Sequence, residues 1–176
     1  MKWIPLITLA MALCQISPLR AEERMIFLVR HAEKQLSADK DPQLSDQGQR
    51  RARDLVRHLH GIPLEGLIAS QFIRTQATLT PLSEDRKLPI RVIPLQQPLA
   101  TSLADIASLV LQGEGNWVIA GHSNTLGPLI EKLGGPAIAP ISENEYDKLF
   151  QLTLSQEQVV GFKTSRYGEP NAKSGE

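Results

Sequence analysis

Cysteine is almost absent from this 176-residue chain, and neither sign of charge dominates. The single cysteine, Cys14, lies near the N-terminus, so a mature chain cut after Ala21 would contain no disulfide bond. Nineteen Lys and Arg residues balance nineteen Asp and Glu residues. The sequence has no long basic run of the kind that binds nucleic acid, so we expect no nucleic-acid partner.

Long hydrophobic runs are missing as well. The apolar run over residues 4–14 is shorter than the roughly 20 residues that a membrane-spanning helix needs. It follows Lys2 and precedes a polar stretch that ends at Ala21, which is the layout of a secretory signal peptide. We therefore expect residues 1–21 to be a signal peptide and the protein to be exported, to the periplasm, without stable membrane association. An uncut N-terminal anchor is the alternative. Lipid attachment at Cys14 is disfavoured, because the preceding Leu13 is not small.

The rest of the chain alternates strand-like and helix-like segments. Short apolar runs predict strands over residues 25–30, 66–70, 90–95, 116–121, 149–154 and 159–166. Helical spacing and capping signals predict helices over residues 45–60, 71–82, 102–111 and from about 122 to 133. We expect the second helix to end at Pro81 or soon after, and Ser102 to cap the third. Trp117 and Phe162 are expected in the core.

This alternation predicts one α/β domain, a three-layer α/β/α sandwich with a mostly parallel sheet. The domain is expected to cover residues 22–168, and residues 169–176 to form a polar C-terminal tail.

Polar residues follow three of the predicted strands. Arg30 and His31 come after the first strand, Arg74 lies shortly after the second, and His122 comes after the fourth. Ligands of open α/β sheets bind beyond the carboxyl ends of the strands, so these side chains should converge. Guanidinium groups match phosphate oxygens in pairs, and helix N-termini also bind anions. A neutral histidine can attack phosphorus, and a protonated one can stabilise the transferring group. The pattern therefore predicts a site for phosphoryl chemistry.

Four segments carry a more specific pattern: RHAEK (residues 30–34), LSDQGQRRA (44–52), SQFIRTQAT (70–78) and GHSNT (121–125). Taken in this order, they resemble the histidine phosphatase superfamily, also described as phosphoglycerate mutase-like. The resemblance runs over about residues 25–168.

This resemblance implies that the protein hydrolyses a phosphomonoester or a phosphohistidine through a covalent phosphohistidine on His31, without a metal or organic cofactor. Its substrate would be a phosphorylated small molecule or a phosphoprotein. The resemblance also implies that His122 completes the pocket. It implies four phosphate-binding residues, which are Arg30, Arg74, Ser123 and Asn124.

The resemblance also implies an acidic residue that protonates the leaving oxygen, and this sequence has no clear counterpart of it. Many members of the superfamily have an acidic residue after the third strand, but residues 94–103 contain no carboxylate. One branch has Asp directly after the second histidine, where this sequence has Ser123. Glu33 is the nearest candidate acid in the sequence. Asp105 is a weaker one, because a position in the first turn of a helix already accounts for it. A reaction that needs no dedicated donor is the third possibility.

These residues allow two other hypotheses, a zinc site and a binding protein without turnover. A zinc site made of His31, His122 and Glu33 is disfavoured, because close metal-ligand spacing is absent and two arginines would repel a cation. A protein that binds phosphate or a phosphorylated ligand with little or no turnover is the alternative function, and the missing acid keeps this alternative open.

The predicted signal peptide gives a direct test. We expect mass spectrometry of the exported protein to find an N-terminus at Glu22, because cleavage is expected after the small residue Ala21. Any other start would contradict the predicted cleavage site, and a retained Met1 would favour the anchor.

Overall fold

The structure is a computed structural model that describes residues 22–171. The predicted signal peptide and the last five residues of the predicted tail lie outside this range. Six strands form one sheet: β1 (Glu23–Arg30), β2 (Gly66–Ala69), β3 (Ile90–Val92), β4 (Trp117–Gly121), β5 (Lys148–Ser155) and β6 (Gln158–Arg166). The four helices are α1 (Asp46–His58), α2 (Ile73–Arg86), α3 (Leu99–Gln112) and α4 (Ser123–Lys132).

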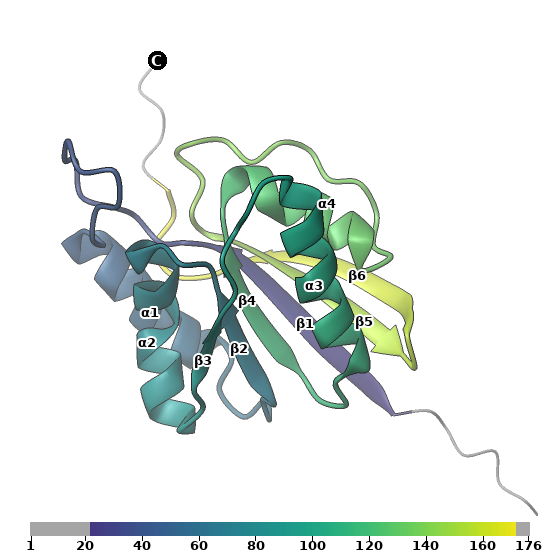
Figure 1. The fold of residues 1–176 in the computed structure, drawn as a ribbon. Coiled ribbons are helices and arrows are strands. Elements are labelled where there is room, and N and C mark those ends of the chain that lie inside the picture. The colour runs from purple at the N-terminus through teal and green to yellow at the C-terminus, as the bar shows by residue number, and fades with distance from the viewer. Residues whose placement is uncertain (1–21, 172–176) are drawn as a thin grey trace, which may run out of the picture.

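The sheet has the order β3-β2-β4-β1-β5-β6 (Figure 1). Strands β3, β2, β4 and β1 are parallel, whereas β5 runs antiparallel to both β1 and β6. Parallel neighbours need a crossover, and the helices supply it; β5 and β6 need only a tight turn. The predicted α/β class and mostly parallel sheet are confirmed.

The helices cover both faces of the sheet, as the alternation of side chains along β1 shows. Ile26 and Leu28 pack with residues of α3 and α4 in one core cluster. Phe27 and Val29 point to the opposite face and pack with residues of α1 and α2. Three layers result, and Figure 1 shows α1 and α2 side by side. None of the helices within residues 22–171 is long and apolar enough to span a membrane.

Three local predictions were wrong. Helix α2 continues through Pro81 to Arg86, because Leu79 and Leu82 are both fully buried and packing outweighs the one hydrogen bond that proline removes. Helix α3 begins at Leu99, so Ser102 lies inside its first turn, where its hydroxyl accepts the N–H of Gln96 at 2.8 Å. Phe162 is 37% exposed, because β6 is the edge strand of the sheet.

Helix α1 begins against the loop that follows β1. The hydroxyl of Ser45 accepts the N–H of Gly48 at 3.2 Å and caps the helix. The Cα of Gly48 faces the main chain of Glu33, so a Cβ there would overlap the Glu33 carbonyl oxygen. A glycine is therefore needed where α1 touches this loop.

We expect Gly48→Ala to lower the free energy of unfolding by about 1–3 kcal/mol, because backbone must move to admit the methyl group. Gly127→Ala is the matched control within α4, since the nearest atom to its added Cβ is a side-chain carbon of Ile138 at 3.5 Å. The control should be neutral or stabilising by up to about 1 kcal/mol. Chemical denaturation measures both, and equal effects would contradict the close approach.

Candidate active site

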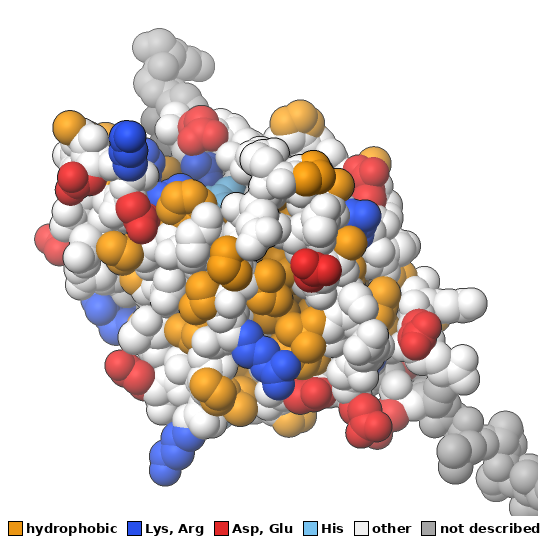
Figure 2. Space-filling model, viewed as in Figure 1, with side chains coloured by type: hydrophobic (Ala, Val, Ile, Leu, Met, Phe, Trp, Pro, Cys, Tyr) orange, Lys and Arg blue, Asp and Glu red, His pale blue; other side chains and the backbone are white. Residues whose placement is uncertain are grey.

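The pocket forms where β1, β2 and β4 end. Arg30 is paired with Gly121 across the parallel strands, and the N–H of His31 donates to the Gly121 carbonyl at 2.9 Å. This pairing brings His31 beside His122, with ring centroids 5.3 Å apart. Both rings are nearly buried, at 4% and 8% exposure. On the face drawn in Figure 2, only a small area of histidine surface is visible, next to Lys or Arg side chains.

The ring of His31 is held in one tautomer. Its Nδ1 lies 2.8 Å from the carbonyl oxygen of Ala32, and because that oxygen can only accept, Nδ1 carries the hydrogen. The other nitrogen, Nε2, then keeps its lone pair. Burial is the main cause that lowers the pKa of His31 to about 3, and the Arg30 charge adds to it. His31 is therefore neutral at physiological pH, as a nucleophile must be.

The ring of His122 is fixed by hydroxyl groups. Its Nε2 lies 3.0 Å from the hydroxyl of Ser70, which also contacts the hydroxyl of Thr75 at 2.9 Å. The main-chain N–H of His122 donates to the hydroxyl of Thr125 at 2.8 Å. Burial first, then the charges of Arg74 and Arg30, lower the pKa of His122 to about 4. Both histidines are thus uncharged in the free protein.

The two arginines of the pocket each keep a free donor. The Nε atoms of Arg30 and Arg74 are buried and have no hydrogen-bond partner among the described residues. Such orphaned donors are rare in folded proteins. Arg86, Trp117 and Tyr167 have unpaired buried atoms as well, but only those of Arg30 and Arg74 lie beside the two histidines. An oxyanion with several acceptor oxygens, such as phosphate, would satisfy them.

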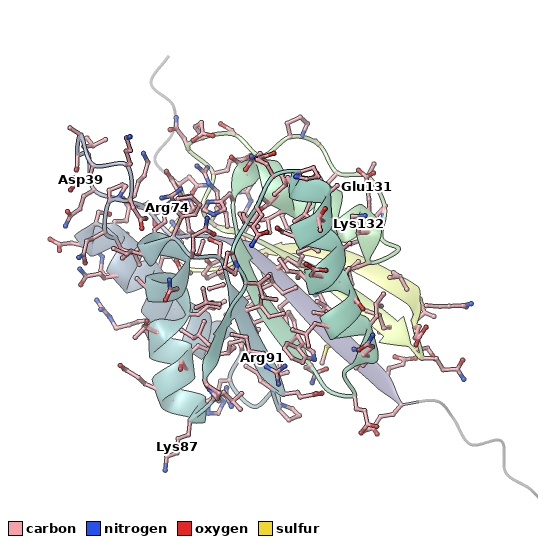
Figure 3. The ribbon with its side chains drawn as sticks, viewed as in Figure 1. Asp39, Arg74, Lys87, Arg91, Glu131 and Lys132 are labelled. Carbon is pink, nitrogen blue, oxygen red and sulfur yellow. The ribbon has the colours of Figure 1, made fainter. Side chains whose placement is uncertain are left out.

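An aromatic ring lies under each of these guanidinium groups. Tyr146 lies 4.3 Å from the Arg30 guanidinium carbon, and Phe72 lies 4.5 Å from that of Arg74. Phe72 also packs edge-on against His122, with ring centroids 5.2 Å apart. Figure 3 shows Arg74 near the end of α2 that faces the loop of Asp39. The aromatic rings were not predicted, although Phe72 lies within a quoted motif.

Two carboxylates in loops also form ion pairs with these arginines, and neither was predicted from the sequence. Asp41 pairs with Arg74 at 3.2 Å, and Glu143 pairs with Arg30 at 2.9 Å. Neither belongs to a motif, and both lie in segments without regular secondary structure, so spacing gave no signal for them.

Of the residues predicted next to His122, Ser123 reaches the pocket and Asn124 does not contact it. The hydroxyl of Ser123 donates to the Glu143 carboxylate at 3.1 Å. The Asn124 side chain is exposed and has no hydrogen-bond partner within residues 22–171.

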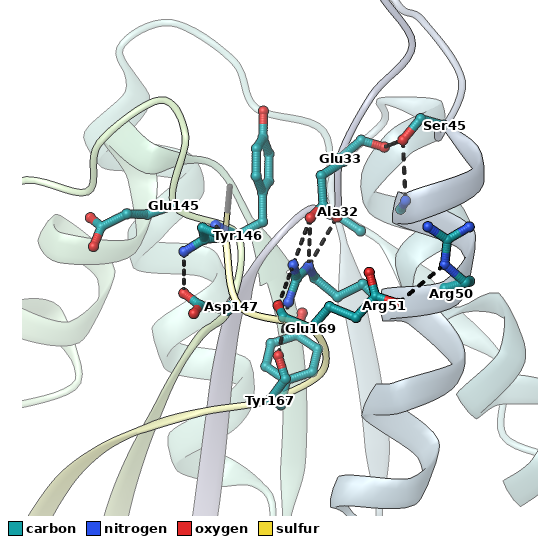
Figure 4. Close-up of polar contacts among 12 residues, drawn as sticks. Ala32, Glu33, Ser45, Arg50, Arg51, Glu145, Tyr146, Asp147, Tyr167 and Glu169 are labelled. Atoms are coloured by element: carbon teal, nitrogen blue, oxygen red, sulfur yellow. Dashed lines mark hydrogen bonds and ion pairs between the residues drawn. The ribbon is translucent and has the colours of Figure 1, made fainter. Parts of the chain in front are cut away.

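Glu33, the predicted acid, forms an ion pair with Arg51 (Figure 4). Its two carboxylate oxygens accept hydrogen bonds from Nε and Nη2 of Arg51 at 2.6–3.0 Å, and Arg51 is 1% exposed. Arg51 also donates to the main-chain oxygens of Tyr167 and Glu169. Both oxygens of Glu33 are therefore occupied by Arg51, and this ion pair ties the loop after His31 to α1. Asp105 is exposed in the second turn of α3, not the first.

No group of three His, Cys, Asp or Glu side chains within residues 22–171 is arranged to hold a metal ion. The fold and the pocket together define the class of the protein. It is a single-domain α/β protein that brings two arginines and two histidines together at the carboxyl edge of its sheet.

The comparisons narrow this class. Residues 26–95 match the family model of the histidine phosphatase superfamily (branch 1). The resemblance to this superfamily is therefore confirmed over residues 26–95, which include three of the four motifs. The matched region ends before His122, which only the fold places in the pocket. No curated protein matches the chain in sequence.

Solved structures share the fold at low sequence identity. The protein histidine phosphatase SixA, in complex with tungstate, is 22% identical, with a TM-score of 0.65 over 81% of this chain and 96% of its own. A mycobacterial glucosyl-3-phosphoglycerate phosphatase is 14% identical, with a TM-score of 0.63 over 83% and 99% of the two chains. The alpha-ribazole phosphatase from Shigella flexneri is 18% identical, with a TM-score of 0.62 over 84% and 96%.

The lowered histidine pKa values predict a titration pattern. In the free folded protein, NMR signals of the His31 and His122 rings should not titrate between pH 5 and 8, whereas in urea they should titrate near 6.5. The folded state binds fewer protons than the unfolded state below pH 6.5, so stability should fall as the pH drops through that value. A ring that becomes protonated above pH 6 without ligand would contradict this account.

Proposed function

We propose that this protein is a metal-independent phosphatase that hydrolyses a phosphomonoester or a phosphohistidine through a covalent phosphohistidine on His31. One observation carries the proposal. His31 presents a lone pair on Nε2, in a neutral ring, close to Arg30 and Arg74, whose buried Nε atoms have no hydrogen-bond partner among the described residues. A nucleophile beside an oxyanion cradle is the arrangement that phosphoryl transfer requires.

The reaction would run in two steps. The lone pair of His31 Nε2 attacks phosphorus, while Arg30 and Arg74 neutralise charge on the equatorial oxygens. The bound phosphate adds negative charge beside His122, which favours its protonated form as a further hydrogen-bond donor. Water then attacks phosphorus, the P–N bond breaks, and inorganic phosphate leaves.

The comparisons support this proposal at the level of the superfamily. The three similar structures are named as phosphatases, and SixA holds tungstate, a tetrahedral oxyanion. Those names describe those proteins, whose substrates differ from one another. The substrate of this chain therefore stays within the broad class of phosphorylated small molecules or phosphoproteins.

We also propose that the protein acts after export, in the periplasm, on the basis of the leader over residues 1–21.

The test is hydrolysis of p-nitrophenyl phosphate, whose leaving group needs little proton donation. We expect turnover that falls by about 1,000-fold or more in His31→Ala, because the nucleophile is lost. His60→Ala is the control, since this histidine is exposed just after the C-terminal end of α1 and should keep activity within about twofold.

A trapped phosphoenzyme gives a second readout. It should be stable in base and labile in acid, as phosphohistidine is, and absent from His31→Ala. Tight phosphate binding without turnover would overturn the proposal in favour of the binding protein.

A further inference from the structure

The proposed reaction leaves one chemical need unmet. An alkoxide is a poor leaving group, so its oxygen must receive a proton as the P–O bond breaks. His31 forms the new bond and cannot also give that proton. His122 is uncharged in the free protein, where its Nε2 is engaged with Ser70, and the proton that it gains with bound phosphate serves to hydrogen-bond the phosphate. A carboxyl group is the other common kind of proton donor, and three carboxyl groups lie near these residues.

Two of the three carboxylates have several hydrogen-bond partners within the protein. Glu33 accepts three hydrogen bonds from the buried Arg51. Asp41 accepts the N–H of Ile73 on both oxygens, at 3.0 and 3.1 Å, and also pairs with Arg74. Ile73 is the first residue of α2, so Asp41 caps a helix N-terminus, where negative charge is favoured. Both groups have partners that a loss of charge would disrupt.

Glu143 is the third carboxylate, and its surroundings differ. It lies in the segment between α4 and β5, and its side chain is 79% exposed. Its Oε2 lies 2.9 Å from Arg30 Nη2, and its Oε1 accepts the hydroxyl of Ser123 at 3.1 Å. Glu143 thus reaches the mouth of the pocket and remains open to solvent, from which it can recover a proton.

The main chain fixes where this side chain can go. Arg30 Nη1 donates to the carbonyl oxygens of both Ser142 and Glu143, each at 2.8 Å. The backbone of Glu143 is therefore tied to the guanidinium group that would hold phosphate. A small rotation of the side chain away from Arg30 Nη2 would free that nitrogen for a phosphate oxygen and leave the carboxyl group beside the bound ester.

We propose that Glu143 is the general acid and base of the reaction, an inference that rests on the proposed function. The proton can come from the substrate, because a monoester binding beside a carboxylate brings two anions together and favours a shared proton. In the first step the P–O bond breaks as His31 Nε2 bonds to phosphorus, and the leaving oxygen takes the proton of Glu143. In the second step the Glu143 carboxylate removes a proton from the attacking water. The P–N bond breaks, inorganic phosphate leaves, and the carboxyl group is restored.

The test compares two substrates in Glu143→Gln, an alkyl phosphate and p-nitrophenyl phosphate. The variant should lower kcat/KM for the alkyl ester by about 100-fold or more, because that leaving group needs the proton. For the nitrophenyl ester, kcat/KM should change by less than about threefold. Its kcat should still fall, and a burst of nitrophenol should appear, because hydrolysis of the phosphoenzyme loses its base.

Two control variants sharpen the test. Glu131→Gln removes an exposed carboxylate at the other end of α4 and should change neither substrate. Asp41→Asn tests the competing acid and should not produce a loss that depends on the leaving group.

Equal losses for both substrates in Glu143→Gln would overturn the inference, and so would a selective loss in Asp41→Asn instead. Tighter inhibition by phosphate in Glu143→Gln with unchanged leaving-group dependence would also overturn it, because Glu143 would then only compete with phosphate for Arg30. If the unmodified protein turns over neither ester, the proposed function itself fails. The inference about Glu143 fails on its own when the unmodified protein is active and Glu143→Gln gives one of the contradicting results above.

Discussion

The register between β1 and β4 is the constraint on which the pocket depends. Pairing of Arg30 with Gly121 places the residues that follow, His31 and His122, side by side at one edge of the sheet. Side chains alternate between the two faces of a strand, so a slip of one residue would turn Arg30 toward the opposite face. Strand β2 is aligned by the same rule, with Ala69 opposite Ala120, and it delivers Ser70 to the same edge.

Electrostatics at this edge are unusual for a protein interior. Two arginines lie beside two buried histidines, and burying a charge is costly unless partners compensate it. Arg30 is compensated by main-chain oxygens and Glu143, and Arg74 by Asp41 and the face of Phe72. The two histidines remain neutral. In the proposed function, a bound anion would add negative charge beside the arginines, where Glu143 and Asp41 now supply it from the loops.

The predictions succeeded where one local signal dominates and failed where packing decides. Buried parallel strands have continuous apolar runs, so β1 and β4 were found within a few residues of their ends. Pro81 is a local signal for a helix end, but buried leucines on both sides of it keep α2 intact. Phe162 is apolar, yet its burial depends on the strand order, which places β6 at the edge of the sheet.

The sequence by itself determined the fold class, the superfamily resemblance and the grouping of Arg30, His31, Arg74 and His122, because parallel strands end at one edge. Only the tertiary structure decided the roles of the carboxylates. Glu33 is close to His31 in the chain but is held by Arg51. Glu143 lies 112 residues after His31 and belongs to no motif, yet it contacts Arg30. Which carboxylate faces the pocket depends on long-range ion pairs and loop paths, and spacing along the chain carries no information about either.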